Sequence, residues 1–195
     1  SRIDDAKQQR RLMDIILADI QRMDRLISDI SQASRVDAEL SIQPTKVYNL
    51  NELLENWASV FTSRHGSDVL SFDAPRRSVK AAIHSTRIIQ ILDNLVANAQ
   101  TFHKGNLPIE LSLKREKGFA VITMADRGRG LPEGKEDKIF QRFYSERPTN
   151  ENFGQHSGLG LSIARQIANA HGGSLVAANR SDGGAIFTLC LPLAR

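Results

Sequence analysis

The chain has 195 residues, 41% of them hydrophobic and 25% charged, and a formal net charge of +4 at pH 7. This length suits one full domain with an appendage, and the composition is that of an ordinary soluble globular protein. No run approaches the roughly 18 apolar residues of a membrane span, and no signal peptide is recognisable. The basic residues are scattered without interleaved aromatics, which argues against nucleic-acid binding through charge. The single cysteine, Cys190, excludes a disulfide framework, and we expect it to be a buried small hydrophobic residue.

Residues 4–38 are predicted to form one long helix. Its apolar positions recur at near-heptad spacing and form a seam, made of Leu12, Ile16, Ile20, Met23, Ile27 and Ile30. A seam of this kind needs a partner, either another part of its own domain or the matching helix of a dimer. We favour the dimer. Because the chain starts at Ser1 inside this charged helical pattern, we expect it to be an excised fragment whose membrane anchor lies upstream.

The central helix is predicted over residues 88–102. Its apolar residues follow helical spacing, namely Ile88, Ile91, Leu95, Ala99 and Phe102. Asn94, Asn98 and Thr101 follow the same spacing on a neighbouring stripe. The two asparagines are either solvated or capping amides, or they face a polar ligand. An amide oxygen is a suitable ligand for Mg²⁺, which keeps water and phosphate oxygens as its other ligands.

The remaining pattern indicates an α/β or α+β sandwich with helices on one face of a mixed sheet. Before the central helix, strands are predicted at 47–48, 69–72 and 78–83 and a helix at 50–61. After it come a hairpin of strands 109–114 and 120–124, a long segment 131–157 with a short helix at 138–143, a helix at 158–170, and strands at 174–178 and 185–191. Loops as long as 131–157 are unusual in compact domains and often functional.

Four short motifs follow the central helix. They are Asp126-Arg127-Gly128-Arg129-Gly130, Ile139-Phe140-Gln141-Arg142-Phe143, Ser157-Gly158-Leu159-Gly160-Leu161 and Gly183-Gly184-Ala185. Each is weak alone, because a glycine pair is more often a turn than a phosphate site. Asp126 is either a turn residue or a carboxylate fixed at a strand end, where it could accept a hydrogen bond from an exocyclic amine. Gly158 and Gly160 open a helix, whose free N–H groups favour an anion.

In this order, after an Asn-x-x-x-Asn helix, the motifs resemble the N, G1, F, G2 and G3 boxes of the ATP-binding domain of sensor histidine kinases. Within that family, residues 22–31 look most like the alphaproteobacterial cell-envelope and acid-sensing kinases. The resemblance implies a Bergerat-type ATP-binding fold at residues 42–195. It also implies that residues 1–41 are the second helix of a dimerisation and histidine-phosphotransfer domain. The expected partners are a second copy, through the 4–38 helix, and a response regulator, with membrane contact only through segments outside this fragment of an inner-membrane protein.

The resemblance also assigns roles to the motif residues. Asp126 would accept a hydrogen bond from the adenine amino group, and Asn98 would hold Mg²⁺ with Asn94 beside it. Where the family often has a Lys or Arg directed at phosphate, this chain has Thr101, and the nearby Lys104 would take over that role. Phe140 and Phe143 would anchor a lid or form a simple hydrophobic staple, and a structural turn is favoured for Gly184. The ATP-binding residues expected in full are Asn94, Asn98, Thr101, Lys104, Asp126, Gly128, Gly130, Phe140, Arg142, Phe143, Gly158, Leu159, Gly160, Leu161 and Gly184.

The chemistry of Asn94 favours a kinase over an ATPase. Hydrolytic enzymes of the same fold carry a glutamate at this position as general base, and an amide cannot accept that proton. The histidines do not match the family's phosphoacceptor pattern, namely His65, His84, His103, His156 and His171, so the acceptor is expected upstream. Two alternatives are a serine/threonine kinase of the same fold and a non-catalytic nucleotide-binding dimer module.

Overall fold

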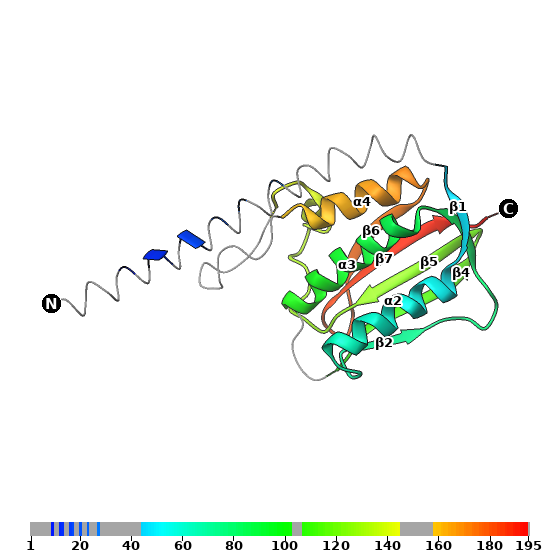
Figure 1. Ribbon diagram of the computed structural model, residues 1–195, viewed down its shortest axis with the longest axis horizontal. Helices are drawn as coiled ribbons and strands as arrows, with labels where there is room; N and C mark the ends of the chain where they lie inside the picture. Colours follow the sequence, from blue (N-terminus) through cyan, green and yellow to red (C-terminus); the bar gives the residue numbers. More distant parts are fainter. Residues whose placement is uncertain are drawn as a thin grey trace.

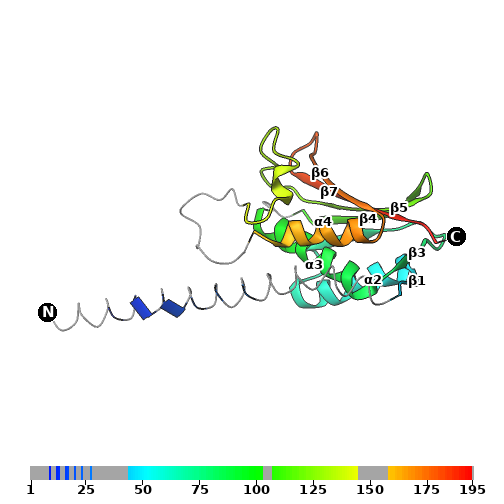
Figure 2. The same cartoon turned by 90° about the horizontal axis from the view of Figure 1, so that it is seen from above.

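The computed structural model describes residues 44–102, 107–144 and 158–194, together with residues 9, 12, 13, 16, 17, 20, 23 and 27. The described domain has two layers (Figures 1 and 2). One layer contains three helices, α2 (Leu50–His65), α3 (Ser85–Phe102) and α4 (Gly160–Ala170). The other is a five-stranded sheet of order β2-β4-β5-β7-β6. This confirms the predicted mixed sheet with helices on one face.

The sheet is mostly antiparallel. β2 (Leu70–Asp73) runs parallel to β4 (Ile109–Glu116), and the other neighbours are antiparallel. These are β5 (Phe119–Ala125), β7 (Ala185–Pro192) and β6 (Ser174–Asn179). The sequence pattern did not predict that β1 (Lys46–Asn49) and β3 (Lys80–Ile83) form a separate two-stranded sheet. That sheet carries the chain into α2 and α3.

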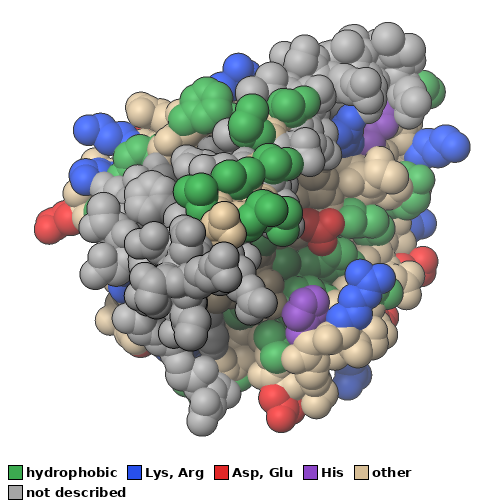
Figure 3. Space-filling model, turned by 60° about the vertical axis from the view of Figure 1, so that its left-hand side comes forward, with side chains coloured by type: hydrophobic (Ala, Val, Ile, Leu, Met, Phe, Trp, Pro, Cys, Tyr) green, Lys and Arg blue, Asp and Glu red, His purple; other side chains and the backbone are tan. Residues whose placement is uncertain are grey.

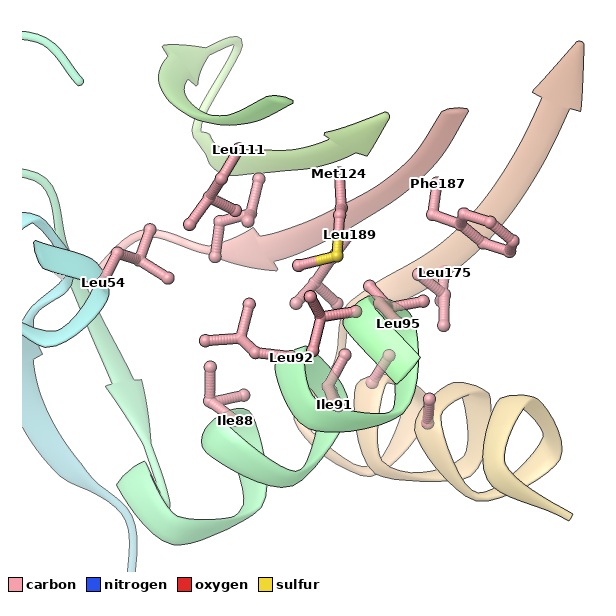
Figure 4. Close-up of a cluster of buried hydrophobic side chains, with 14 of the residues drawn as sticks. Leu54, Ile88, Ile91, Leu92, Leu95, Leu111, Met124, Leu175, Phe187 and Leu189 are labelled. Carbon is pink, nitrogen blue, oxygen red and sulfur yellow. The ribbon is translucent and has the colours of Figure 1, made fainter. Parts of the chain in front are cut away.

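The core lies between the helices and the covered face of the sheet (Figure 4). Alternate residues of β4, β5 and β7 point into it, as the period of a strand requires. They meet the apolar stripe of α3, whose Ile88, Ile91 and Leu92 are fully buried. Burial of this apolar surface is the main stabilising contribution to the domain. It fixes α3 by one face and leaves the neighbouring stripe, which carries Asn94 and Asn98, at the edge of the core.

Cys190 corrects one expectation. In β7 the odd-numbered residues are buried and the even-numbered ones are half-exposed or exposed. Cys190 is therefore half-exposed on the open face of the sheet rather than buried. Both faces of β7 are largely apolar in sequence, so composition alone could not reveal which face the helices cover.

Four helix boundaries also differ from the sequence prediction. α3 begins at Ser85 rather than at residue 88. α2 extends beyond residue 61 to His65 and ends at Gly66, which has φ +105°. The predicted helix at 138–143 is a short 3-10 helix, η1 (Lys138–Phe140). Gly158, predicted as the start of the next helix, precedes α4 with φ +72°.

The N-terminal helix lies largely outside the described residues. Five seam residues are described, and all are helical with 47–61% of their surface exposed, namely Leu12, Ile16, Ile20, Met23 and Ile27. Large apolar side chains exposed in one row are typical of an interaction surface. Within the described part of the chain, no helix is both long and apolar enough to span a bilayer.

Candidate functional site

The central carboxylate of the site is Asp126, directly after the end of β5. Its side chain is 2% exposed, and it is the only buried charged residue among those described. Oδ1 accepts hydrogen bonds from the backbone N–H groups of Gly128 (2.7 Å) and Ala185 (3.3 Å). Both donors hold the same oxygen, which fixes the orientation of the carboxylate and leaves Oδ2 for a further donor.

Two glycines allow the backbone to pack around this carboxylate. A Cβ atom on Gly184 would lie 2.0 Å from the carbonyl oxygen of Asp126, and one on Gly128 would lie 2.4 Å from that of Phe102. Both distances are far below van der Waals contact, so only glycine fits. The Gly128 contact also places the turn after β5 against the C-terminal end of α3, where the Arg129 guanidinium lies 4.9 Å from the Phe102 ring centroid.

The start of α4 contacts the middle of α3, at Asn94. A Cβ atom on Gly160 would lie 3.2 Å from Oδ1 of Asn94. Nδ2 of Asn94 is buried and has no hydrogen-bond partner among the described residues. A buried donor without a partner is costly, and it suits a site whose acceptor is a bound ligand. Thus α3 contacts Gly160 at Asn94 and Gly128 at Phe102, with the half-buried Asn98 between them.

These elements gather at one end of the molecule. The end of α3, the end of β5 and the beginning of α4 all lie at the left-hand end of the two-layer domain in Figure 1. Figure 3, turned toward that end, shows hydrophobic side chains gathered around a hollow. Lys and Arg side chains are scattered over the same view, most of them toward its margin.

Of the two residues considered for the phosphate-directed position, the structure describes Thr101 but not Lys104. The Thr101 hydroxyl donates to the carbonyl of Ala97 (2.9 Å) within α3, which is the usual local bond of a helical threonine. Lys104 lies outside the described residues, as do His103 and His156. The structure therefore gives no geometry for the predicted phosphate-directed lysine.

Phe140 and Phe143, predicted to act together as a lid anchor or a hydrophobic staple, have different surroundings. Phe140 is buried, meets Phe187 edge-to-face at 6.5 Å and lies under the Arg165 guanidinium. Phe143 is 60% exposed and has φ +65°, so it does not share that buried position. The reason is that η1 stops at Phe140 and the chain turns away. Arg142 is exposed and lines a shallow hollow with the outer face of α4.

The turn that follows Asp126 is held by a residue that sequence reasoning missed. Asn179, at the end of β6, accepts from the N–H of Leu131 (2.6 Å) and donates to its carbonyl (2.9 Å). Gly130 has φ +76°, which disfavours a side chain, and a Cβ there would also lie 2.6 Å from Asn179 Oδ1 and displace that amide. The only sequence signal for this pair of hydrogen bonds is an Asn that lies four residues before the Gly183-Gly184 turn.

The remaining predicted residues lie at the start of α4. Leu159 is 1% exposed and its carbonyl accepts from Ile163 N–H and from the Ser162 hydroxyl. Leu161 is half-buried and packs against the core. The carbonyl of Gly158 accepts from the N–H of Phe143 (3.1 Å), which joins the two ends of the segment between them.

This architecture matches a known class of protein. Residues 83–195, more than half of the chain, match the family described as "Histidine kinase-, DNA gyrase B-, and HSP90-like ATPase". The chain therefore belongs to that family, and the sequence-based prediction of a sensor histidine kinase catalytic domain is confirmed at this level. The description of the family as an ATPase implies the use of ATP.

Similar proteins define the relationship more closely. The chain is 44% identical over 200 residues to the sensor protein ChvG of Rhizobium meliloti (strain 1021), covering 95% of this chain and 35% of that protein. It is 28% identical to the solved catalytic domain of the histidine kinase ThkA, with a TM-score of 0.66, covering 77% of this chain and 96% of that one. The ATP-binding domain of PrrB from Mycobacterium tuberculosis is 27% identical, with a TM-score of 0.61, covering 78% and 100% respectively. The chain spans about a third of the length of the curated relatives it matches.

Proposed function

We propose that residues 42–195 bind Mg²⁺-ATP and present its γ-phosphoryl group to a histidine upstream of residue 1. From that histidine the phosphoryl group passes to a response-regulator aspartate. The observation that carries the proposal is the set of contacts along α3, which meets the phosphate-type turn at Gly160 and the Asp126 turn at Gly128. α3 thereby lies against both the turn that carries the Asp126 carboxylate, proposed to bind the base, and the start of α4, whose free N–H groups suit phosphate.

Each group has a chemical role in this proposal. Asp126 accepts a hydrogen bond from the adenine amino group through the oxygen that the backbone does not hold. The N–H groups at Gly158, Leu159 and Gly160 face the phosphates, and the partnerless Nδ2 of Asn94 donates to a phosphate oxygen. Gly130 and Gly184 let the backbone approach closely, and Phe140 anchors the segment that precedes α4.

Asn98 is the proposed Mg²⁺ ligand. Within the described chain, no three His, Cys, Asp or Glu side chains are grouped as a metal site. The fitting arrangement is therefore one amide oxygen with phosphate and water ligands, which Mg²⁺ accepts readily. When bound, the ion would neutralise charge on the phosphate oxygens. Because Asn94 replaces a hydrolytic glutamate and cannot accept a proton from water, the γ-phosphoryl group would be preserved for transfer.

We further propose that residues 1–41 belong to the dimerisation domain and pair with the same helix of a second copy. The support is the row of exposed apolar residues at Leu12, Ile16 and Ile20. In the whole protein, this chain would be the cytoplasmic part of a membrane-anchored sensor.

The test uses the full cytoplasmic region, including the upstream helix, and labelled ATP. We expect acid-labile label in the parent and none in the Asn98→Ala variant, because alanine removes the amide oxygen that is proposed to hold Mg²⁺. Acid-labile label that persists in the variant, or never forms in the parent, would contradict the proposal. Acid-stable label on an added protein would support a serine/threonine kinase instead. The 195-residue chain alone should bind Mg²⁺-ATP in calorimetry without becoming labelled.

A further inference from the structure

Four charged side chains form a closed ring next to the Asp126 turn. Arg127 donates to Glu110 Oε1 (2.9 Å) and to Asp182 Oδ2, and Arg180 donates to Glu110 Oε2 (3.0 Å) and to Asp182 Oδ1 (2.9 Å). Each carboxylate therefore bridges both guanidinium groups. We call these four residues the ion ring. Its charges cancel, so it is not suited to attract a phosphate.

The ion ring lies behind the carboxylate that faces the site. Consecutive residues of an extended chain point to opposite faces, so Arg127 points away from the side to which the buried Asp126 points. Glu110 is half-exposed on β4, between buried residues that face the helices, which places it on the open face of the sheet. The ring thus spans the open face at the level of the site without touching the nucleotide side.

The ring ties together the two segments that orient Asp126. Arg127 belongs to the turn that supplies the Gly128 N–H, and Asp182 belongs to the β6–β7 turn that precedes Ala185. Of the two hydrogen bonds to Asp126 Oδ1, the one from the Ala185 N–H is the longer, at 3.3 Å. The Ala185 carbonyl in turn accepts a hydrogen bond from the Asp126 N–H at 2.9 Å. A shift of the β6–β7 turn would therefore lengthen the weaker bond and leave the carboxylate held by the Gly128 N–H alone, free to turn about that bond.

Isolated ion pairs at a surface contribute little, because each must order two long side chains against solvent. Here the four side chains are between 13% and 53% exposed and each bonds to two others. The conformational entropy lost by ordering one side chain is therefore offset by more than one ion pair. The pKa of Asp182 is lowered, first by its hydrogen bond to Arg180 and then by that to Arg127. The pKa of Glu110 is lowered too, chiefly by its hydrogen bond to Arg180. Both carboxylates are thus ionised in the folded chain near neutral pH.

We infer that the ion ring is a positioning device that aims the Asp126 carboxylate, and so sets the preference of the site for adenine over other purines. This inference rests on the proposed adenine-reading role of Asp126. Hypoxanthine presents a carbonyl where adenine presents an amine, so a rigidly held carboxylate rejects it by opposing two acceptors. A carboxylate that can turn away loses this discrimination, although the triphosphate still binds.

The test compares the dissociation constants of ATP and ITP, measured by calorimetry on the 195-residue chain. We expect Glu110→Gln and Asp182→Asn to reduce the preference for ATP by about threefold or more, the scale of one lost charge-assisted contact. Asp182→Glu, which keeps the charge, should restore most of it. Glu116→Gln is the matched control, since Glu116 lies at the other end of the same face of β4 and should leave the ratio unchanged.

A second measurement needs no mutation. In the parent, raising NaCl from about 0.1 M to about 1 M screens the half-exposed ring and should lower the ATP/ITP ratio. Screening of the phosphates cancels in this ratio, because both ligands carry the same triphosphate. A ratio that stays constant in salt and in the ring variants, while their unfolding free energies fall, would reduce the ring to a structural role and overturn the inference.

Asp126→Asn separates this inference from the proposed function. If Asp126→Asn leaves the ATP/ITP ratio unchanged, Asp126 does not read adenine and the proposed role fails. If Asp126→Asn lowers the ratio but the ring variants do not, only the positioning role of the ion ring fails.

Discussion

At the scale of single residues, Gly183 and Gly184 have almost the same φ angle in different surroundings. Their φ values are +93° and +94°, in the left-handed region that disfavours side chains. A Cβ on Gly183 would meet nothing within 4 Å, whereas one on Gly184 would lie 2.0 Å from the Asp126 carbonyl oxygen. Substitution of Gly183 therefore tests backbone strain alone, whereas substitution of Gly184 tests backbone strain together with the close approach to Asp126.

We predict that Gly183→Ala lowers the free energy of unfolding by about 1 kcal/mol, the cost of a side chain at positive φ. Gly184→Ala should cost about 3 kcal/mol or more and weaken ATP binding, since the turn must move away from Asp126. Urea unfolding and calorimetric ATP titration of both variants check this. Equal effects of the two substitutions would show that the close approach is unimportant.

His171 joins the end of α4 to the beginning of α3. The His84 backbone N–H donates to its Nε2 at 3.1 Å, so Nδ1 carries the proton and donates to the Ile167 carbonyl at 2.8 Å. Burial lowers the pKa of His171, and the nearby His84 adds to this, while the bond to Ile167 opposes it. A protonated ring would lose its acceptor for the His84 N–H, so the folded chain favours the neutral form.

This arrangement predicts a pH-dependent stability. The unfolded chain binds the His171 proton more readily, so the free energy of unfolding should be highest above about pH 6.5 and fall below it. His171→Gln, which retains an acceptor without titrating, should reduce the loss measured by urea unfolding between about pH 7.5 and pH 5.5. His65→Gln is the control, since exposed His65 makes the same kind of bond to a carbonyl four residues earlier, that of Phe61. A His171 variant with the parent's full pH dependence would contradict this account.

At the scale of elements, α2 is fastened to α3 next to the candidate site. The buried Trp57 stacks on Phe61 at 5.5 Å and donates from Nε1 to Asp93 Oδ1 at 2.9 Å. Asp93 directly precedes Asn94, so this bond constrains the turn of α3 that contacts Gly160. The helix layer thus contributes to the site through packing as well as through the site residues themselves.

We predict that Trp57→Phe, which keeps the aromatic stack, lowers the free energy of unfolding by about 1 kcal/mol through the lost hydrogen bond. Asp93→Ala should cost a similar amount, and the double variant should cost less than the sum, with a coupling of about 0.5 kcal/mol or more. Circular dichroism during urea unfolding suits all three proteins, since it does not depend on tryptophan. Strict additivity would show that the bond contributes nothing.

At the scale of the whole molecule, the exposed row on the N-terminal helix predicts self-association. Ile16 and Ile20 are 47% and 52% exposed, and burying them between two helices would remove them from water. We predict that the chain sediments as a dimer at micromolar concentration and that Ile20→Asp shifts it to monomer. Val60→Asp, at a similarly exposed position on α2, should leave the dimer intact. A parent chain that sediments as a clean monomer would refute the pairing.

Local periodicity determined which segments form helices and strands, and it limited the fold class to α/β or α+β. The apolar stripe of α3, the alternation of β4 and β5 and the position of Asp126 at a strand end all follow from spacing, because each helix or strand must bury one face. The order of the motifs then pointed to the family. These features depend on neighbours in sequence, so they could be predicted before the elements were assembled.

Only the tertiary structure decided which distant groups meet. The ion ring joins residues that are up to 70 positions apart, and Asn179 meets Leu131 across 48 positions. The exposure of Cys190 and Phe143 also depended on assembly, through the choice of covered sheet face and the early end of η1. Periodicity states that faces alternate, but strand order, register and helix placement determine which face is covered and which side chains come into contact.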